Sequence, residues 1–330
     1  MEQALPLIFM ALMGVAMLAY VVLDGFDLGV GLLLPLVDDA DKDRMIAAIG
    51  PFWDANETWL VLGAGILLVA FPQAHGVVLT ALYLPVAFML VGLILRGVAF
   101  DFRVKARAEH KALWNRAFVA GSALAAFAQG FMLGKYVLGF AAGLWPTLFA
   151  ALIGLCLMAA YTLLGACWLL MKTSAPLKRR AAGWARRALW GTALGLAAVS
   201  LATPLASERI FQKWFLMPQF ILLLEVPLAS AVLLLVADRR LKRLCQADLP
   251  RPWEPFACAV GLFVLAAIGL AYSLYPYLVV DRLTAWQAAA APESLKFILV
   301  GVVITLPAIV AYTVYVYRVF WGEAGELRYE

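Results

Sequence analysis

Histidine is scarce in this chain: His75 and His110 are the only two among 330 residues. Both fall outside the long apolar segments, so no pair of histidines is expected to hold a haem within a bilayer. Four cysteines are present, and none forms a C-x-x-C pair. We interpret them as small apolar packing residues rather than disulfides or metal ligands. The sequence therefore predicts no metal site, no cofactor ligand and no catalytic residue in this chain alone.

Charged residues are also few, at 14% against 65% hydrophobic residues, with a mean hydropathy of +0.90. Soluble domains carry about 25% charged residues, and about 20 apolar residues suffice for a helix to cross a membrane. We predict an all-α polytopic membrane protein forming a single membrane domain over 1–330. The apolar segments that predict its nine transmembrane helices are 5–36, 55–72, 77–100, 116–135, 145–171, 188–206, 217–237, 256–276 and 297–320.

The basic residues predict the orientation of these helices. Twenty of the 26 Lys and Arg residues lie in alternate connections and the C-terminal tail, and only five lie in the other connections. Positive charge favours the cytoplasmic side, so we expect a periplasmic N-terminus and a cytoplasmic C-terminus. This alternation explains the net charge of +5 without nucleic-acid binding. Eighteen of the twenty lie in the connections that follow the first, third, fifth and seventh segments, and Arg318 and Arg328 lie in the tail.

Acidic residues occur where an apolar segment would normally exclude them. LDGFDLGVGLLLP (23–35) places Asp24 and Asp27 three residues apart on one helix face, next to a Gly25/Gly29 pair that permits close helix packing. PFWDANETWL (51–60) places Asp54 and Glu57 at the start of the next segment. Arg96 lies near the end of the third segment. Because successive helices run in opposite directions, these five residues are expected in one layer near the cytoplasmic side.

A proton pathway is the functional interpretation of this layer. One guanidinium cannot neutralise four carboxylates, so some of the acids are expected to be protonated near neutral pH, as in membrane proton relays. A structural alternative stays open: Asp54 and Glu57 have the spacing of a helix capping box, and Asp24 or Asp27 could pair with Arg96 only to fasten two helices. Glu225, followed by Pro227, is a lone acid in the seventh segment and is interpreted as a local hydrogen-bonding device.

Several long motifs resemble subunit II of cytochrome bd-type quinol oxidases, in particular the cyanide-insensitive branch. They are LDGFDLGVGLLLP, GPFWDANETWLVLGAGILLVAFP, LILRGVAFDFRVKA and YPYLV with PESLKFILVGVVITLPAIVAYTVYVYRVFWG, and together they run from the first apolar segment to the last. The chain departs from many members at Ala55, Asn56 and Glu57, where they have Gly-Asn-Gln. The extra acid, Glu57, is one reason for the branch assignment.

The resemblance implies two four-helix bundles plus a peripheral helix, the first bundle with the acid cluster within 1–136 and the second, with the last helix, within 145–320. It implies a partner, subunit I, which carries haem b and haem d, oxidises quinol and reduces oxygen to water in the bacterial inner membrane. A small single-helix subunit, lipid and quinone are further expected partners. Residues matching Asp27, Asp54 and Arg96 lie near the subunit interface of the family and are associated with a proton route.

Two other functions stay open at this point. A proton-coupled secondary transporter would also use intramembrane acids and proline-interrupted helices, although no pair of broken segments occurs in corresponding halves. A purely structural subunit would use the acids to fasten helices together. Co-purification with a haem protein separates an oxidase subunit from a transporter.

Overall fold

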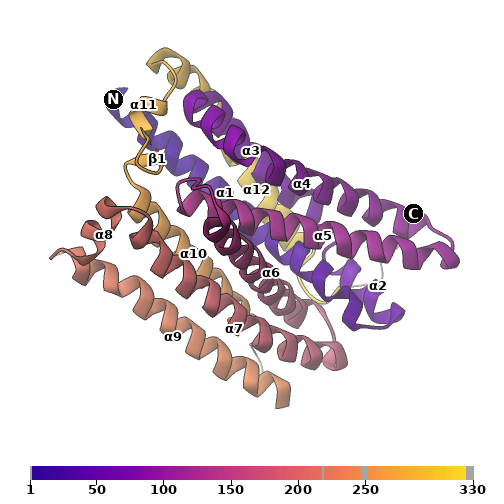
Figure 1. Ribbon diagram of the computed structural model, residues 1–330. Helices are drawn as coiled ribbons and strands as arrows, with labels where there is room; N and C mark the ends of the chain where they lie inside the picture. The colour runs from indigo at the N-terminus through magenta and orange to yellow at the C-terminus, as the bar shows by residue number, and fades with distance from the viewer. Residues whose placement is uncertain (1, 218, 247–250, 325–330) are drawn as a thin grey trace.

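The computed structural model describes residues 2–217, 219–246 and 251–324. Within these residues the chain is almost entirely helical (Figure 1). The long helices are α1 (Leu5–Leu33), α3 (Trp53–Ala70), α4 (Pro72–Lys105), α5 (Ala108–Val137), α6 (Leu144–Lys172), α7 (Ala175–Ala206), α9 (Gln219–Gln246), α10 (Glu254–Leu274) and α12 (Pro292–Val319). The short elements are η1 (Glu2–Ala4), η2 (Leu34–Leu36), α2 (Asp39–Ala47), α8 (Glu208–Phe215), α11 (Ala285–Ala288), β1 (Tyr277–Val279) and β2 (Leu283–Thr284).

Each predicted apolar segment corresponds to one long helix. Seven helices in the described part of the chain are long and apolar enough to cross a membrane by length and composition, so the all-α polytopic membrane class is confirmed. α3 and α9 are the two long helices outside that group. The first turns of α3 are polar because they hold Asp54, Asn56 and Glu57. The count of nine transmembrane helices stays a prediction.

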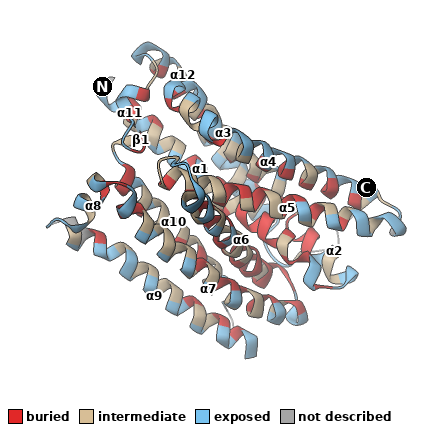
Figure 2. Ribbon diagram, in the orientation of Figure 1, coloured by how far each residue is buried: buried red, intermediate tan, exposed pale blue. Residues whose placement is uncertain are grey.

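Helix α1 lies at the centre of the molecule and packs against α3, α5 and α6. α4 packs on α5, α5 on α6 and α6 on α7, while α9 packs on both α7 and α10. α12 touches mainly α1 and α3, and most of its surface is exposed. Figure 2 shows buried residues concentrated on α1, α5 and α6, and exposed residues along the outer edges of α4 and α9. The division into two bundles, 1–136 and 145–320, stays a prediction.

The predicted close approach of a helix beside the Gly25/Gly29 pair is confirmed. The neighbour is α6: a Cβ added to Gly29 would lie 1.8 Å from the carbonyl oxygen of Tyr161. Across the contact, a Cβ on Gly165 would lie 2.4 Å from the backbone nitrogen of Val30. The two backbones therefore meet where neither helix carries a side chain.

Hydrogen bonds join the segments at each end of the helix bundle. At one end, Trp286 Nε1 donates to the carbonyl of Gln3 (2.9 Å), and the Ala290 amide donates to the carbonyl of Ala70 (2.8 Å). At the other end, Lys172 donates to the carbonyl of Phe320. α12 therefore begins at the end where α1 begins, which agrees with an odd number of crossings.

Two regions contain structure that the apolar segments do not show. The connection at 275–297 contains an antiparallel pair, β1 and β2, followed by the four-residue α11, whose N-terminus is closed by a Thr284/Gln287 capping box. The sixth apolar segment was expected to start at 188, but α7 begins at Ala175. Its basic first turns are too polar to count as apolar sequence, yet they continue the same helix.

Candidate functional site

The centre of the site is a buried arginine held by acids from two helices. Arg96, on α4, is 1% exposed, and its Nη1 lies 2.6 Å from Oδ1 of Asp24 on α1, which is fully buried. Its Nη2 donates to Oε1 of Glu57 on α3. The planar guanidinium can bind two carboxylates in this way because its donors form a fixed fork. Three helices are thus joined at one cation.

Asp27 lies beside this ion pair and has a different partner. Its side chain is fully buried, and its Oδ2 accepts a hydrogen bond from Asn56 Nδ2 (2.8 Å), which also reaches the carbonyl of Leu23 (3.3 Å). Tyr317 of α12 donates to Asn56 Oδ1 at 3.3 Å. Asn56 therefore links Asp27 to the last helix. The expected pairing of Arg96 with an acid of α1 is found at Asp24, not at Asp27.

The five predicted site residues form a gradient of exposure. Asp54 is exposed, the Glu57 side chain is 27% exposed, and Arg96, Asp24 and Asp27 are buried. Asp54 and Glu57 lie one helical turn apart and interact electrostatically. Polar groups therefore lead from the surface at the start of α3 to the centre of the α1, α3 and α4 contact.

The capping alternative for Asp54 is wrong. α3 begins at Trp53, its N-cap residue is Phe52, and no side chain caps it. Asp54 is inside the first turn rather than before it, so a D-x-x-E capping box does not form. The Trp53 ring instead faces the site, with the Arg96 guanidinium carbon 5.9 Å from the ring centroid.

Next to the site, a group of ion pairs that we call the charged clamp joins α2 to α4 and α5. Asp43 of α2 binds Arg103 of α4 and, at 2.7 Å, Lys111 of α5. Partial burial acts to raise the pKa of Asp43, but the hydrogen bonds from Lys111 and Arg103 outweigh it and hold this pKa below its usual value. Arg103 also donates to Asn115 of α5. The clamp fixes the amphipathic α2 against the ends of α4 and α5.

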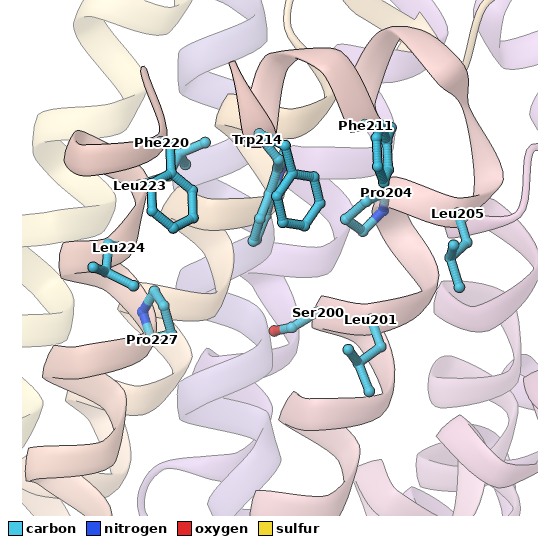
Figure 3. Close-up of a pocket in the computed structure, with 11 residues that line it drawn as sticks. Ser200, Leu201, Pro204, Leu205, Phe211, Trp214, Phe220, Leu223, Leu224 and Pro227 are labelled. Atoms are coloured by element: carbon cyan, nitrogen blue, oxygen red, sulfur yellow. The ribbon is translucent and has the colours of Figure 1, made fainter. Parts of the chain in front are cut away.

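Glu225 lies far from this cluster. It is exposed on α9, a helix that packs on α7, α8 and α10. Beside it, α7, α8 and α9 enclose an apolar pocket of about 310 Å³ (Figure 3). Phe211 and Trp214 of α8 face Pro227 of α9 across it, and the described residues that line it include no titratable acid or base.

The two histidines do not form a bis-histidine haem site. His75 lies in the first turn of α4, and His110, which is exposed, lies in the first turn of α5. The length of α4 separates the two histidines, so they cannot serve one macrocycle. No group of three or more His, Cys, Asp or Glu residues suited to a metal ion occurs in the described ranges. That this chain ligates no haem stays a prediction.

Sequence reasoning missed four polar residues that contact the cluster or its neighbours. Asn56 was read only as part of a motif, although an amide between two acids at a helix start is a signal for hydrogen bonding to them. Tyr20, Gln129 and Tyr161 are also buried together, with Gln129 bridging the two tyrosine hydroxyls. Of these last three residues, Gln129 alone carries a signal in the sequence, because an amide in an apolar helix needs a partner.

Together the fold and the cluster define a helical membrane protein that holds several carboxylates and one buried arginine in a single layer. Comparisons with known proteins give the family. The sequence profile of cytochrome bd terminal oxidase subunit II matches residues 5–320. The chain belongs to that family.

Individual relatives agree over shorter stretches. The chain is 38% identical over 119 residues to cytochrome bd ubiquinol oxidase subunit 2 of Bacillus subtilis, covering 35% of each chain. It is 33% identical over 123 residues to cytochrome bd-I ubiquinol oxidase subunit 2 of Escherichia coli K12, covering 36% of this chain and 32% of that protein. These alignments span about a third of the length of the curated relatives.

A solved structure, the bd oxidase from Geobacillus thermodenitrificans, shows the same fold over nearly the whole chain. The TM-score is 0.75 at 17% identity, covering 96% of this chain and 98% of the other. At that identity the likeness concerns the fold alone.

Proposed function

We propose that this chain supports a haem-bearing subunit I in a bd-type terminal quinol oxidase, with cyanide-insensitive enzymes as the expected branch. In this proposal subunit I carries haem b and haem d, oxidises quinol and reduces oxygen to water, while the present chain ligates no haem and is not catalytic alone. Family membership favours this function over the proton-coupled transporter. A small single-helix subunit and membrane lipid are the further partners expected of such a complex.

The same proposal gives the buried cluster the task of supplying protons. Asp54 and Glu57 form the entrance, and Asp24, Asp27 and Arg96 form the buried end. The observation that carries the proposal is the imbalance of charge: Asp24, Asp27 and Glu57 surround one guanidinium. An arginine stays charged in proteins, and a buried unpaired charge is costly. The acids in excess of that single positive charge can therefore bind and release protons.

The partner subunit is proposed to cover the face formed by α3, α4 and α12. Large apolar residues project from it, among them Val61 (72% exposed), Ile94 (65%) and Ile304 (69%). Glu57 of α3 has a side chain that is 27% exposed, and Tyr317 of α12 is joined to the site through Asn56. A haem protein docked here would receive protons directly from the buried acids.

The proposed direction of proton flow is from the cytoplasm. It requires the start of α3 to lie on the cytoplasmic side of the inner membrane, as the basic residues predict. Reporter fusions after Phe102 and Trp184 should both report cytoplasm, and a fusion after Arg282 should report periplasm. A cytoplasmic signal from the Arg282 fusion would contradict the orientation.

Assembly and conduction can be tested in one preparation. The affinity-purified chain should bring down a haem protein whose absorption spectrum shows b-type haem and d-type haem. Asp27→Asn should keep that spectrum but lower quinol oxidase turnover at least about tenfold, since positioned proton-transferring side chains commonly contribute about 100-fold or more. Glu225→Gln is the matched control, because it neutralises an acid outside the cluster. Equal turnover in the two variants would reject the proton route, and absence of haem would reject the oxidase assignment.

A further inference from the structure

Three buried polar side chains form a string that runs from α6 through α5 to α1. The Tyr161 hydroxyl donates to Gln129 Oε1 at 2.6 Å, and Gln129 Nε2 donates to the Tyr20 hydroxyl at 2.7 Å. Tyr20 is 1% exposed, Tyr161 is fully buried and Gln129 is 9% exposed. Since the Tyr20 oxygen accepts from Gln129, the Tyr20 proton is left to donate elsewhere.

Asp24 is the acceptor that this proton faces. Tyr20 precedes Asp24 by four residues on α1, so both side chains lie on one face of the helix, and the two groups interact. Asp24 Oδ1 is taken by Arg96. Asp24 Oδ2 is fully buried and has no hydrogen-bond partner among the residues that the structure describes.

We propose that Tyr161, Gln129 and Tyr20, which we call the tyrosine string, are positioning residues that aim the Tyr20 proton at Asp24 Oδ2 and so fix on Asp24 the negative charge that balances Arg96. The inference rests on the proposed proton route and assigns different tasks to its acids. Asp24 acts as a permanent counter-ion. Glu57, the second acid on the same guanidinium, and Asp27 are then the groups that carry protons.

The energetics of the cluster support this division. Arg96 donates to Asp24 and to Glu57, so hydrogen bonds from the guanidinium alone do not decide which carboxylate keeps the charge. A further donor on one of them decides it, because a hydrogen bond to a charged group changes an equilibrium about tenfold or more. Asp27 receives a neutral amide donor from Asn56, and its Oδ1 is an unpartnered buried atom in the described part of the chain. With the Tyr20 proton added to the Arg96 ion pair, Asp24 accepts from two donors, whereas Glu57 and Asp27 each have one donor among the described residues.

Packing against neighbouring residues also holds the tyrosine string in place. The ring of Tyr161 lies against Gly25, the residue after Asp24, where an added Cβ would come within 2.8 Å of the ring carbons Cδ1 and Cε1. The Tyr161 ring also stacks on Phe263 of α10, with ring centroids 6.2 Å apart. Gly25 therefore lets the tyrosine string reach α1, and a larger residue there would shift Tyr161 away from Gln129.

Infrared spectroscopy of the purified oxidase complex tests the proposal, because ionised and protonated carboxyl groups absorb separately. Tyr20→Phe removes only the hydroxyl, and at neutral pH it should produce a carboxylic-acid band that the unmodified complex lacks. That band should disappear when Asp24→Asn is added. Tyr136→Phe is the matched control: the half-buried Tyr136 hydroxyl donates to the carbonyl of Leu278 outside the cluster, and its loss should add no such band.

Gln129→Met and Gly25→Ala should give the same new band, since each breaks the string at another link, whereas Gly14→Ala should not, because nothing lies within 4 Å of its added Cβ. The new band should therefore appear in each of the three broken-string variants and in neither control. An unchanged carboxyl spectrum in both Tyr20→Phe and Gln129→Met would overturn the proposal. This readout does not depend on turnover, so a failed proton route in Asp27→Asn and a failed string are distinguishable.

Discussion

Replacing Arg96 with methionine removes the guanidinium while keeping an unbranched side chain about as long as the arginine stem. Asp24 is then left as a fully buried acid without its ion-pair partner, and Glu57 loses a donor while keeping its 27% exposure. Removing one partner of a buried ion pair costs about 3–5 kcal/mol of unfolding free energy. Most of that cost should arise at Asp24, because Glu57 can still reach water.

The double variant Asp24→Asn/Arg96→Met separates lost charge from lost packing. It removes both members of the pair, so about 2 kcal/mol or more of the lost unfolding free energy should return, with the residual deficit due to unpaired polar atoms. Arg96→Lys keeps the charge but not the fork that binds two acids, and its unfolding free energy should be intermediate. The assay is equilibrium unfolding of the purified complex in mixed micelles. Equal unfolding free energies for the single and double variants would refute the reasoning.

Three further predictions concern other parts of the chain. Gly29→Ala should destabilise the fold by about 1–3 kcal/mol or more in the same unfolding assay, because its Cβ would meet a backbone oxygen at 1.8 Å, whereas Gly14→Ala should be near neutral. Asp54→Asn and Asp54→Ala should both lower quinol oxidase turnover at normal yield of folded complex, and a loss of yield confined to the alanine variant would restore a capping role. Because the pKa of Asp43 is lower in the folded chain than in the unfolded one, its ion pairs stabilise α2 above about pH 4 and lose that effect as the pH falls. Hydrogen exchange of α2 should therefore accelerate on acidification, and Asp43→Asn should abolish the change.

Much of the arrangement follows from periodicity and charge alone. The first apolar segment, 5–36, coincides with α1 and η2, and alternating helix directions bring Asp24, Glu57 and Arg96 to one depth, as their contacts show. Which acid of α1 pairs with Arg96 could not be predicted from the sequence. Asp24 and Asp27 share a face, and only the rotation of α1 against α4 decides which of them meets Arg96. That rotation is set by Gly29 packing on α6, a contact between segments more than 100 residues apart.

Short elements escaped prediction for a related reason. α2 is polar on average, so an apolar search cannot find it, and its position depends on ion pairs from Asp43 to Arg103 and Lys111. The tyrosine string was hidden because tyrosines in apolar helices are common packing residues. The proposed role of the string depends on the two hydrogen bonds of Gln129. These bonds join three helices and exist only in the folded chain.

Proton uptake in the Glu57→Gln complex tests the central claim most directly. Glutamine keeps the size of the side chain and can still accept from Arg96, while Asp24 retains its ion pair, so assembly and haem content should stay normal. When the reduced complex reacts with oxygen, a pH-indicating dye should report proton uptake slowed at least about tenfold, since positioned proton-transferring groups commonly contribute about 100-fold or more. Steps of haem oxidation that need no proton should keep their rate. Proton uptake at the unmodified rate in this variant would contradict a route through the buried cluster.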